Sequence, residues 1–249
     1  MPTHLNLPDA YNVRDLGGYF TNTGRITNYQ KYIRSGTLHL LSKGSIDKLK
    51  EYGVKTVIDL RQNYEVKAKP DVFHNSTTVN YIHINMIGDG EVEAFYDQGS
   101  DTVDTVSGMY ISWLENRKPY IKEVISALAA STSDTTLFHC NGGKDRVGTI
   151  SSLLLSICDV PTMTIAEDYT LSGKFLMKRF FDEQAPPDVT PNNYTWVDYQ
   201  KDYCPAEAML KVHNHLKQKY GTILNYIDSI GVSKTDVNSI KSALLGSIS

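Results

Sequence analysis

The sequence predicts an α/β fold in which a mostly parallel central sheet is flanked by helices, with a helical layer at the C-terminus. Short β-branched apolar runs alternate with stretches of helical apolar spacing, a pattern typical of parallel sheets connected by helices. The chain has 249 residues, of which 41% are hydrophobic and 21% charged, enough for one large domain or two small ones. We expect one domain over residues 1–249, with a core over about residues 10–172 and a helical part over about residues 205–249.

Capping residues and apolar runs predict the first elements. Ser45 is placed to cap a helix through IDKLKEY, and Gly53 supplies the left-handed residue that ends it. The run VKTVIDL (54–60) has the composition of a buried parallel strand, and YIHI (81–84) predicts another strand. Residues 85–104 are rich in glycine and acidic residues, which predicts a loop or a weakly structured lid.

Helix and strand patterns continue to alternate in the second half of the chain. Pro119 opens a helix that extends to the polar break STSD, and TTLFH (135–139) follows as a strand. Helical spacing resumes over residues 146–157, residues 184–193 predict a second loop, and three helical patterns follow from Ala206. The TTLFH strand therefore leads through a short loop into a helix.

Composition excludes several classes of protein. The formal net charge of -3 provides no overall basic field for a nucleic acid or an acidic membrane surface. The chain has no apolar run that could span a membrane and no signal-peptide pattern, so we expect a soluble, cytoplasmic protein, with export by a non-classical route left open. The cysteines form no C-x-x-C pair, which fits neither a disulfide framework nor a zinc finger. Nothing in the sequence indicates an oligomeric state.

The segment FHCNGGKDRVGTI (138–150) has the features of an anion-binding loop. It connects a strand to a helix, so the backbone N–H groups and the dipole of the helix start point at one place. Gly142 and Gly143 allow the backbone to turn back with positive φ. The loop is not a Walker A motif, because Lys144 is followed by Asp145 rather than by serine or threonine.

A cysteine at the base of such a loop is predicted to be a nucleophile. Helix N-termini and neighbouring Arg or Lys side chains favour the thiolate form of cysteine, and Cys140 stands where both would act on it. Arg146 is placed to bind two oxygens of a phosphoryl group with its guanidinium. A free cysteine is more often a buried structural residue, which is the role we expect for Cys158 and Cys204.

Several segments together resemble one protein family. HCNGGKDRVG (139–148) resembles the H-C-x-x-G-K-D-R-T-G signature of the bacterial tyrosine phosphatases called triple-specificity phosphatases, which are relatives of the dual-specificity and lipid phosphatases. Further segments resemble that family's N-F-R-D-L-G-G-Y, R-S-x-x-L, D-L-R-x-x-x-E and C-terminal motifs: NVRDLGGY (12–19), IRSGTL (33–38), VIDLRQNYE (57–65), DYTLS (168–172) and YGTILNYIDSIGV (220–232). The resemblance covers nearly the whole chain.

The resemblance implies a protein-tyrosine-phosphatase-like fold and a hydrolase that forms a phosphocysteine intermediate, without a metal or other cofactor. Position by position, it makes Cys140 the nucleophile and Arg146 the phosphate clamp. The implied phosphate cradle is the loop backbone up to Arg146: Asn141, Gly142, Gly143, Lys144 and Asp145.

The resemblance also implies roles for three charged side chains. Asp145 matches the loop aspartate proposed in this family as general acid, and Asp59 of the D-L-R motif is a second candidate. Lys144 matches the lysine with which lipid phosphatases hold extra phosphates on an inositol ring. The implied substrates are phosphorylated proteins, carrying phosphotyrosine, phosphoserine or phosphothreonine, and phosphoinositides.

One position of the loop departs from the family. Thr or Ser usually follows the arginine, and this chain has Val147. The family's hydroxyl is implied to help the sulfur leave, so slow turnover is expected, and a phosphate-binding pseudophosphatase is an alternative. A rhodanese or arsenate-reductase type of enzyme is less favoured, because Cys140 is mid-chain and Cys158 lies on an unrelated apolar helix.

Other polar residues have both a functional and a structural interpretation. His139 either tunes the thiolate and orients the loop or is a structural histidine at a strand end. Arg14 and Asp15 are expected to pair with each other in a turn rather than to reach the site. A solvated acidic loop is favoured over a lid acid for three aspartates: Asp97, Asp101 and Asp104.

Overall fold

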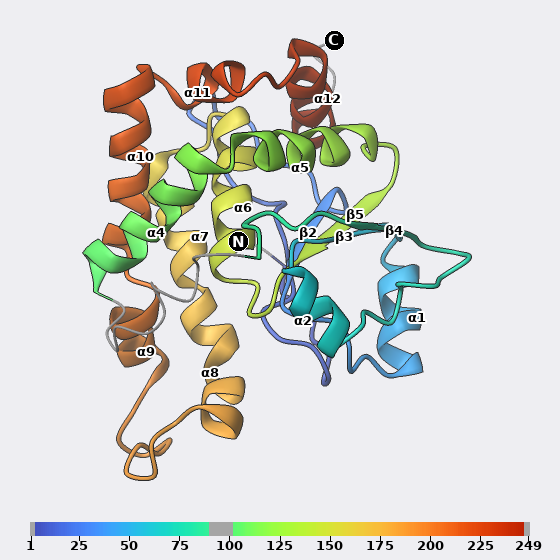
Figure 1. Cartoon of the computed structure of the whole chain (residues 1–249), viewed down its shortest axis with the longest axis vertical. Coiled ribbons are helices and arrows are strands. Elements are labelled where there is room, and N and C mark those ends of the chain that lie inside the picture. The colour runs from blue at the N-terminus through green and yellow to red at the C-terminus, as the bar shows by residue number, and fades with distance from the viewer. Residues whose placement is uncertain (1–2, 90–101, 247–249) are drawn as a thin grey trace.

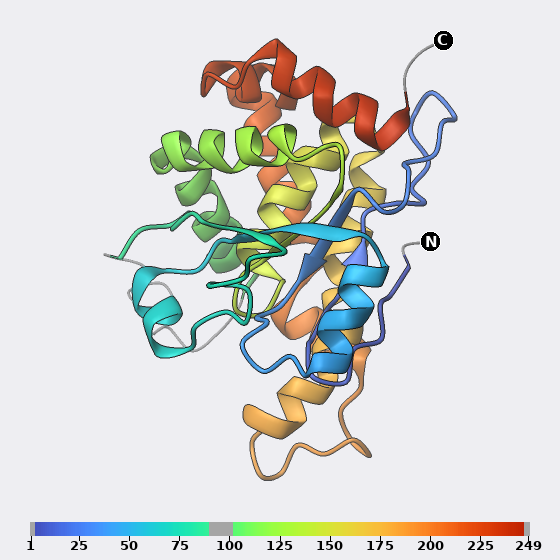
Figure 2. The same ribbon diagram turned by 90° about the vertical axis from the view of Figure 1, so that its right-hand side faces the viewer.

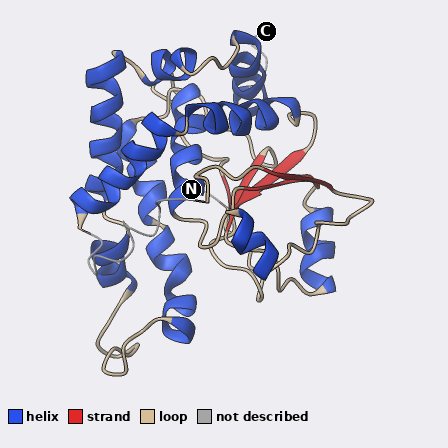
Figure 3. Ribbon diagram, viewed as in Figure 1, coloured by secondary structure: helices blue, strands red, loops and turns tan. Residues whose placement is uncertain are grey.

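The computed structural model describes residues 3–89 and 102–246 and has the predicted α/β architecture, with a five-stranded sheet surrounded by helices (Figure 1, Figure 3). The strand order is β1-β2-β5-β3-β4, in which β1 is antiparallel to β2 and the other pairs are parallel. The strands are β1 (Arg14–Asp15), β2 (Tyr32–Ser35), β3 (Val54–Asp59), β4 (Asn80–His83) and β5 (Thr135–His139).

The described helices lie between and after these strands. They are α1 (Lys43–Glu51), α2 (Asn63–Ala68), α4 (Val103–Asn116), α5 (Lys118–Ala130), α6 (Asp145–Ile157), α7 (Thr162–Thr170), α8 (Ser172–Glu183), α9 (Trp196–Tyr203), α10 (Ala206–Tyr220), α11 (Ile223–Ser229) and α12 (Lys234–Leu245). None of the described helices is long and apolar enough to cross a membrane.

The sheet is covered on both faces, which explains its continuous apolar strands. The side view in Figure 2 shows α1 against one face and a thick helical layer, including α5, α6 and α10 to α12, on the other. Successive residues of β5 point to opposite faces of the sheet. Leu137 packs in the cluster on the α1 side, and Phe138 packs in the larger cluster on the helical side. The helical C-terminal part is thus one wall of the core.

The register of the parallel strands brings their carboxyl ends to one edge of the sheet. Asp59 of β3 and Ser35 of β2 are both paired with His139, the last residue of β5. Loops that follow parallel strands at this edge are where ligands bind in open α/β sheets. The predicted anion loop follows β5 at this edge.

Most predicted boundaries agree with the structure to within one or two residues, and β5 agrees with it to the residue. The start of α1 is a correction. Its N-cap is Ser42, whose side chain accepts a hydrogen bond from the backbone N–H of Ser45, so Ser45 lies inside the first turn. Gly53 has φ 105°, as the predicted left-handed stop requires.

The predicted acidic loop is described only in part. Asp97 and Asp101 lie outside the described residues. Asp104 belongs to the first turn of α4 and forms an ion pair with Lys211 of α10. The expectation that residue 104 lies in a loop is therefore wrong, because Thr102 caps a helix that begins at Val103.

Candidate active site

The loop after β5 turns sharply into α6, and Gly143 makes this turn possible. Gly143 has φ 66°, and a Cβ atom at this position would lie 2.4 Å from the carbonyl carbon of Ser35. No larger residue fits there without moving the backbone of β2. Of the two glycines predicted to have positive φ, Gly143 has it and Gly142 does not, so the prediction for Gly142 is wrong. Gly143 alone allows the loop to pack directly against the neighbouring strand.

The N-terminal segment holds the loop from behind. Nδ2 of Asn12 donates to the carbonyl of Gly143 at 2.9 Å and to that of Gly142 at 3.1 Å. Arg34 of β2 donates from NH2 to the carbonyl of Gly143 at 2.8 Å. Hydrogen bonds that occupy the loop carbonyls in this way favour a single loop conformation.

A buried carboxylate at the end of α7 fixes the orientation of this arginine. Asp168 forms ion pairs with Arg14 at 3.0 Å and with Arg34 at 2.5 Å, and it accepts a hydrogen bond from Tyr19 at 2.6 Å. Burial alone would raise the pKa of Asp168, but the two guanidinium groups outweigh it and lower the pKa to about 2. The carboxylate is therefore ionised at neutral pH.

Arg14 and Asp15 do not pair with each other as predicted. Arg14 binds Asp168, whereas Asp15 accepts hydrogen bonds from the backbone N–H groups of Gly17 and Gln30 and from the hydroxyl of Tyr52. The reason is β1 itself, because successive side chains of a strand point to opposite faces of the sheet. Both residues are structural, but Arg14 stabilises the loop through Asp168.

The first backbone amides of the loop are not used in hydrogen bonds within the described part of the protein. None of the residues that the structure describes accepts a hydrogen bond from the backbone N–H of Asn141, Gly142 or Gly143. Asp145 is the first residue of α6, so the positive end of that helix lies at the same place. Unpaired amides at a helix start form an anion site.

Cys140 lies at the base of this loop and is buried, with 1% of its surface exposed. The two other cysteines are buried elsewhere, and burial raises the pKa of Cys158 and of Cys204 to about 12. Their thiols therefore stay protonated at neutral pH, which leaves Cys140 as the candidate nucleophile.

Glu65 is a site residue whose role the sequence analysis missed. Its carboxylate binds Arg146 through two contacts, from NH1 at 2.5 Å and from NH2 at 3.1 Å. Burial opposes ionisation, but Arg146 outweighs it and lowers the pKa of Glu65. The signal was present, because Glu65 is the last residue of the VIDLRQNYE segment (57–65). Through its two contacts, the Glu65 carboxylate sets the plane in which the Arg146 guanidinium lies.

A cavity of about 490 Å³ opens beside the loop. One wall consists of Asn141, Gly142 and the residues from Lys144 to Arg146. The other walls come mainly from α2, α8 and α9, with Ile87 from the loop after β4, and they include three aromatic side chains: Tyr64, Tyr199 and Tyr203. The cavity is large enough for an aromatic ring next to the anion site.

The rim of the cavity is fastened to α8 and α9 by two cationic side chains. Nζ of Lys144 donates to the carbonyl of Tyr203 at 2.8 Å. Arg179 donates to the carbonyl of Asn141 at 3.0 Å and to its side-chain oxygen at 3.1 Å. Lys144 and Asn141 thus both line the cavity, each held by a helix outside the predicted core.

Asp145 also lies at the cavity, and its side chain is 19% exposed. Its Oδ1 atom accepts a hydrogen bond from the hydroxyl of Tyr110 at 2.5 Å and lies 3.5 Å from Nζ of Lys144. A carboxyl group that faces a ligand cavity and is held by a buried donor has the geometry of a general acid.

Asp59 has a different environment, fully buried at the end of β3. Arg61 binds it through Nε and NH2, and the hydroxyl of Tyr81 donates to it at 2.8 Å. The nearby charges of His139 and Arg61 outweigh burial and hold the pKa of Asp59 far below its usual value. A carboxyl group with a lowered pKa, outside the cavity, is less suited to act as general acid than Asp145, which lines the cavity.

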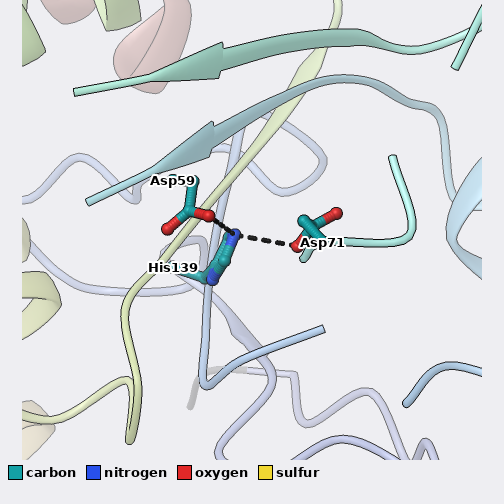
Figure 4. Close-up of side chains that lie close together, drawn as sticks. All are labelled: Asp59, Asp71 and His139. Carbon is teal, nitrogen blue, oxygen red and sulfur yellow. Dashed lines mark ion pairs between the residues drawn. The ribbon is translucent and has the colours of Figure 1, made fainter. Parts of the chain in front are cut away.

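His139 lies between two buried carboxylates, as Figure 4 shows. Its Nε2 atom is 3.1 Å from Asp71 and 3.7 Å from Asp59, as ion-pair contacts rather than aligned hydrogen bonds. Burial would lower the pKa of His139, but the two carboxylates outweigh it and raise the pKa. The histidine therefore has a structural environment, beside the loop rather than in the cavity.

The same three side chains are the one group in the described part of the chain with the composition of a metal site, with ligand atoms within 4.8 Å of one another. Asp59 already carries the guanidinium of Arg61 at 2.6 Å. A metal ion would have to displace that charge and a proton of His139. The cluster fits an internal ion-pair network better than a metal ion.

Neither Val147 nor Gly143 is among the residues that line the cavity. Val147 is fully buried in the core cluster on the helical side, because its position in the first turn of α6 faces the core. Thr149 does not replace the missing hydroxyl, since it donates to the backbone carbonyl of Asp145 at 3.0 Å.

Comparison with known proteins finds one matching family profile and several relatives. The sequence profile described as the tyrosine phosphatase family matches residues 5–246. The chain is 29% identical over 214 residues to a tyrosine-protein phosphatase of Nostoc commune, a match that covers 84% of this chain and 72% of that relative. It is 23% identical over 278 aligned positions to a triple-specificity protein phosphatase of Mycobacterium tuberculosis, covering 96% of this chain and 98% of that relative.

Proposed function

The chain belongs to the tyrosine phosphatase family, and on this premise we propose that it hydrolyses phosphotyrosine through a phosphocysteine intermediate on Cys140. The observation that carries the proposal is the loop between β5 and α6, whose unpaired amides stand next to a cavity with Cys140 at the base. We also propose that residues 1–249 form one phosphatase domain, which the family match over residues 5–246 supports.

In the first step, the Cys140 thiolate attacks phosphorus, a sulfur–phosphorus bond forms, and the bond from phosphorus to the leaving oxygen breaks. Asp145 donates its proton to that oxygen. In the second step, water attacks phosphorus, Asp145 takes a proton from the water, and the thiolate leaves with inorganic phosphate as product. The loop amides and Arg146, held by Glu65, stabilise the equatorial oxygens in both steps.

The charges of the cavity favour a substrate with one phosphate. Three cationic side chains, Lys144, Arg146 and Arg179, line it with two carboxylates, Glu65 and Asp145. Each of the cations already contacts a carboxylate. An inositol ring with several phosphates would meet little uncompensated positive charge, whereas the aromatic wall fits a tyrosine ring. We therefore propose that the enzyme prefers phosphotyrosine to phosphoserine, phosphothreonine and phosphoinositides as substrate.

Steady-state phosphate release from a phosphotyrosine peptide, a phosphoserine peptide, an inositol phosphate and para-nitrophenyl phosphate tests the proposal. We expect kcat/KM to be highest for the two aryl phosphates. EDTA should leave activity unchanged, and vanadate should inhibit. A metal-dependent activity, or phosphopeptide binding without turnover, would contradict the proposal.

Two cysteine variants test the nucleophile. Cys140→Ser should abolish turnover and keep phosphate binding, because the proposed cradle is mostly backbone. Cys204→Ser is the matched control, since Cys204 is also fully buried and contacts the carbonyl of Thr170. Substantial activity in Cys140→Ser, or equal losses in both variants, would exclude Cys140 as the nucleophile.

A further inference from the structure

A buried hydroxyl chain ends on Asp145. It runs from Tyr169 to Tyr110 and then to the Asp145 carboxyl group. We infer that Tyr110 is a positioning residue for proton transfer: its hydroxyl fixes Oδ1 of Asp145 and leaves Oδ2 to carry the proton to and from the reacting oxygen. The inference rests on the proposed role of Asp145 as the general acid.

The side chains of this hydrogen-bonded row come from three helices: α4, α6 and α7. The hydroxyl of Tyr110, on α4, is 2.5 Å from Oδ1 of Asp145 at the start of α6. The hydroxyl of Tyr169, on α7, is 2.9 Å from that of Tyr110. Tyr110 is 0% exposed and Tyr169 is 1% exposed, and their rings meet edge to face at 5.9 Å. Neither hydroxyl has room to exchange its partner for water.

The chemistry of the partners determines which group donates in each of these hydrogen bonds. An ionised carboxylate can only accept, so Tyr110 donates its single proton to Asp145 and accepts a hydrogen bond from Tyr169. Burial first, and then the charge of Asp145, hold the pKa of Tyr110 well above its usual value. The Tyr110 hydroxyl therefore carries its proton at neutral pH and can donate it in a hydrogen bond.

The two carboxyl oxygens of Asp145 consequently have different environments. Oδ1 receives the Tyr110 hydroxyl and lies 3.5 Å from Nζ of Lys144. Within residues 3–89 and 102–246, no side chain or backbone group donates a hydrogen bond to Oδ2. When Asp145 is protonated, its proton therefore belongs on Oδ2, because Oδ1 is already occupied by a donor. After the proton has been transferred, the hydrogen bond to Oδ1 stabilises the carboxylate.

Loss of the Tyr110 hydroxyl should therefore slow hydrolysis most for substrates whose leaving oxygen must receive a proton. A hydrogen bond to a charged group corresponds to a factor of about 10 to 100 in rate. We expect Tyr110→Phe to lower kcat/KM for a phosphotyrosine peptide by about that factor, and kcat/KM for para-nitrophenyl phosphate by less than about 3-fold, because nitrophenoxide leaves with little help.

The experiment measures the ratio of the two kcat/KM values in each protein. This ratio does not depend on the fraction of folded enzyme, because that fraction scales both values equally. Breakdown of the phosphoenzyme does not affect it either, because kcat/KM reports only the steps up to formation of the phosphoenzyme. Tyr226→Phe is the matched control, since the hydroxyl of this fully buried tyrosine donates to the backbone of Leu114 at 2.8 Å. Its ratio should stay at the wild-type value. Tyr169→Phe should change the ratio less than Tyr110→Phe and in the same direction.

Asp145→Asn separates this inference from the proposed function. We expect Asp145→Asn to change the ratio strongly, and Tyr110→Phe to change it by less than about 2-fold further in the Asp145→Asn background. An unchanged ratio in Tyr110→Phe, together with a strong change in Asp145→Asn, would overturn only the inference. An unchanged ratio in Asp145→Asn would overturn the general-acid assignment and the inference with it.

Discussion

Asp168→Asn should destabilise both the fold and the loop, because it removes the charge that two buried arginines share. Arg14 and Arg34 are 0% exposed, and Asp168 contacts both at 3.0 Å and 2.5 Å. Removing one partner of a buried ion pair costs about 3–5 kcal/mol, since the other charge stays buried without compensation. We therefore expect the free energy of unfolding of Asp168→Asn to fall by about 3–5 kcal/mol.

Urea denaturation at neutral pH measures this loss, with Asp182→Asn as control. The Lys178–Asp182 pair lies on the surface, with side chains 69% and 46% exposed, so its removal should leave the unfolding free energy nearly unchanged. The sign of the pH dependence follows from the pKa of about 2, which is below the ordinary 3.8. The stabilisation is complete above about pH 4 and is lost as the pH falls towards 2.

The loop should respond in the same variant. Arg34 binds both Asp168 and the carbonyl of Gly143, so its release should weaken vanadate inhibition of the folded enzyme. A fall in unfolding free energy of less than about 1 kcal/mol, with unchanged vanadate inhibition, would refute the reasoning that this ion-pair network supports the loop.

Three further predictions concern single residues. Glu65→Gln should lower kcat/KM for aryl phosphates by about 10-fold and weaken vanadate inhibition, because Arg146 loses its bidentate partner; equal or tighter inhibition would contradict this. If the hydroxyl that Val147 lacks limits breakdown of the phosphoenzyme, rapid mixing with para-nitrophenyl phosphate will show a burst of nitrophenol, and Val147→Thr will raise the steady rate; no burst and no gain would refute the idea. Burial lowers the pKa of His213 from 6.5 to about 4, so the unfolded state binds a proton first and stability falls by about 3 kcal/mol as the pH drops from 6.5 to 4. His213→Leu should flatten this slope in pH-dependent denaturation, and an unchanged slope would show that another group causes it.

The sequence predicted the part of the molecule that depends on local patterns. The strand of residues 135–139, the turn at Gly143 and the helix that follows are all encoded within one segment of the chain. The family motifs also marked the segments that contain Asn12, Arg34, Glu65 and Asp168. What they contact could not be predicted, because Asn12 is 131 positions from Gly143 in sequence and no local pattern specifies such a pairing.

The sequence analysis overlooked Tyr110 although a helical signal was present. Val106, Met109, Tyr110 and Trp113 are buried and recur at helical spacing in α4. Serine and glycine between them obscured the pattern. For Asp59, the D-L-R motif indicated an important carboxylate. Only its three-dimensional contacts with Arg61 and His139 show that this carboxylate is buried in an ion-pair network.

Direct detection of the phosphoenzyme tests whether Cys140 is the nucleophile. Rapid denaturation of the enzyme during turnover of a phosphotyrosine peptide, followed by peptide mass spectrometry, would locate any covalently bound phosphate. Our account predicts phosphate on the peptide that contains Cys140, as a cysteine adduct, and none in Cys140→Ser. Phosphate on another residue, such as the neighbouring His139, or phosphate release by Cys140→Ser at the wild-type rate, would contradict it.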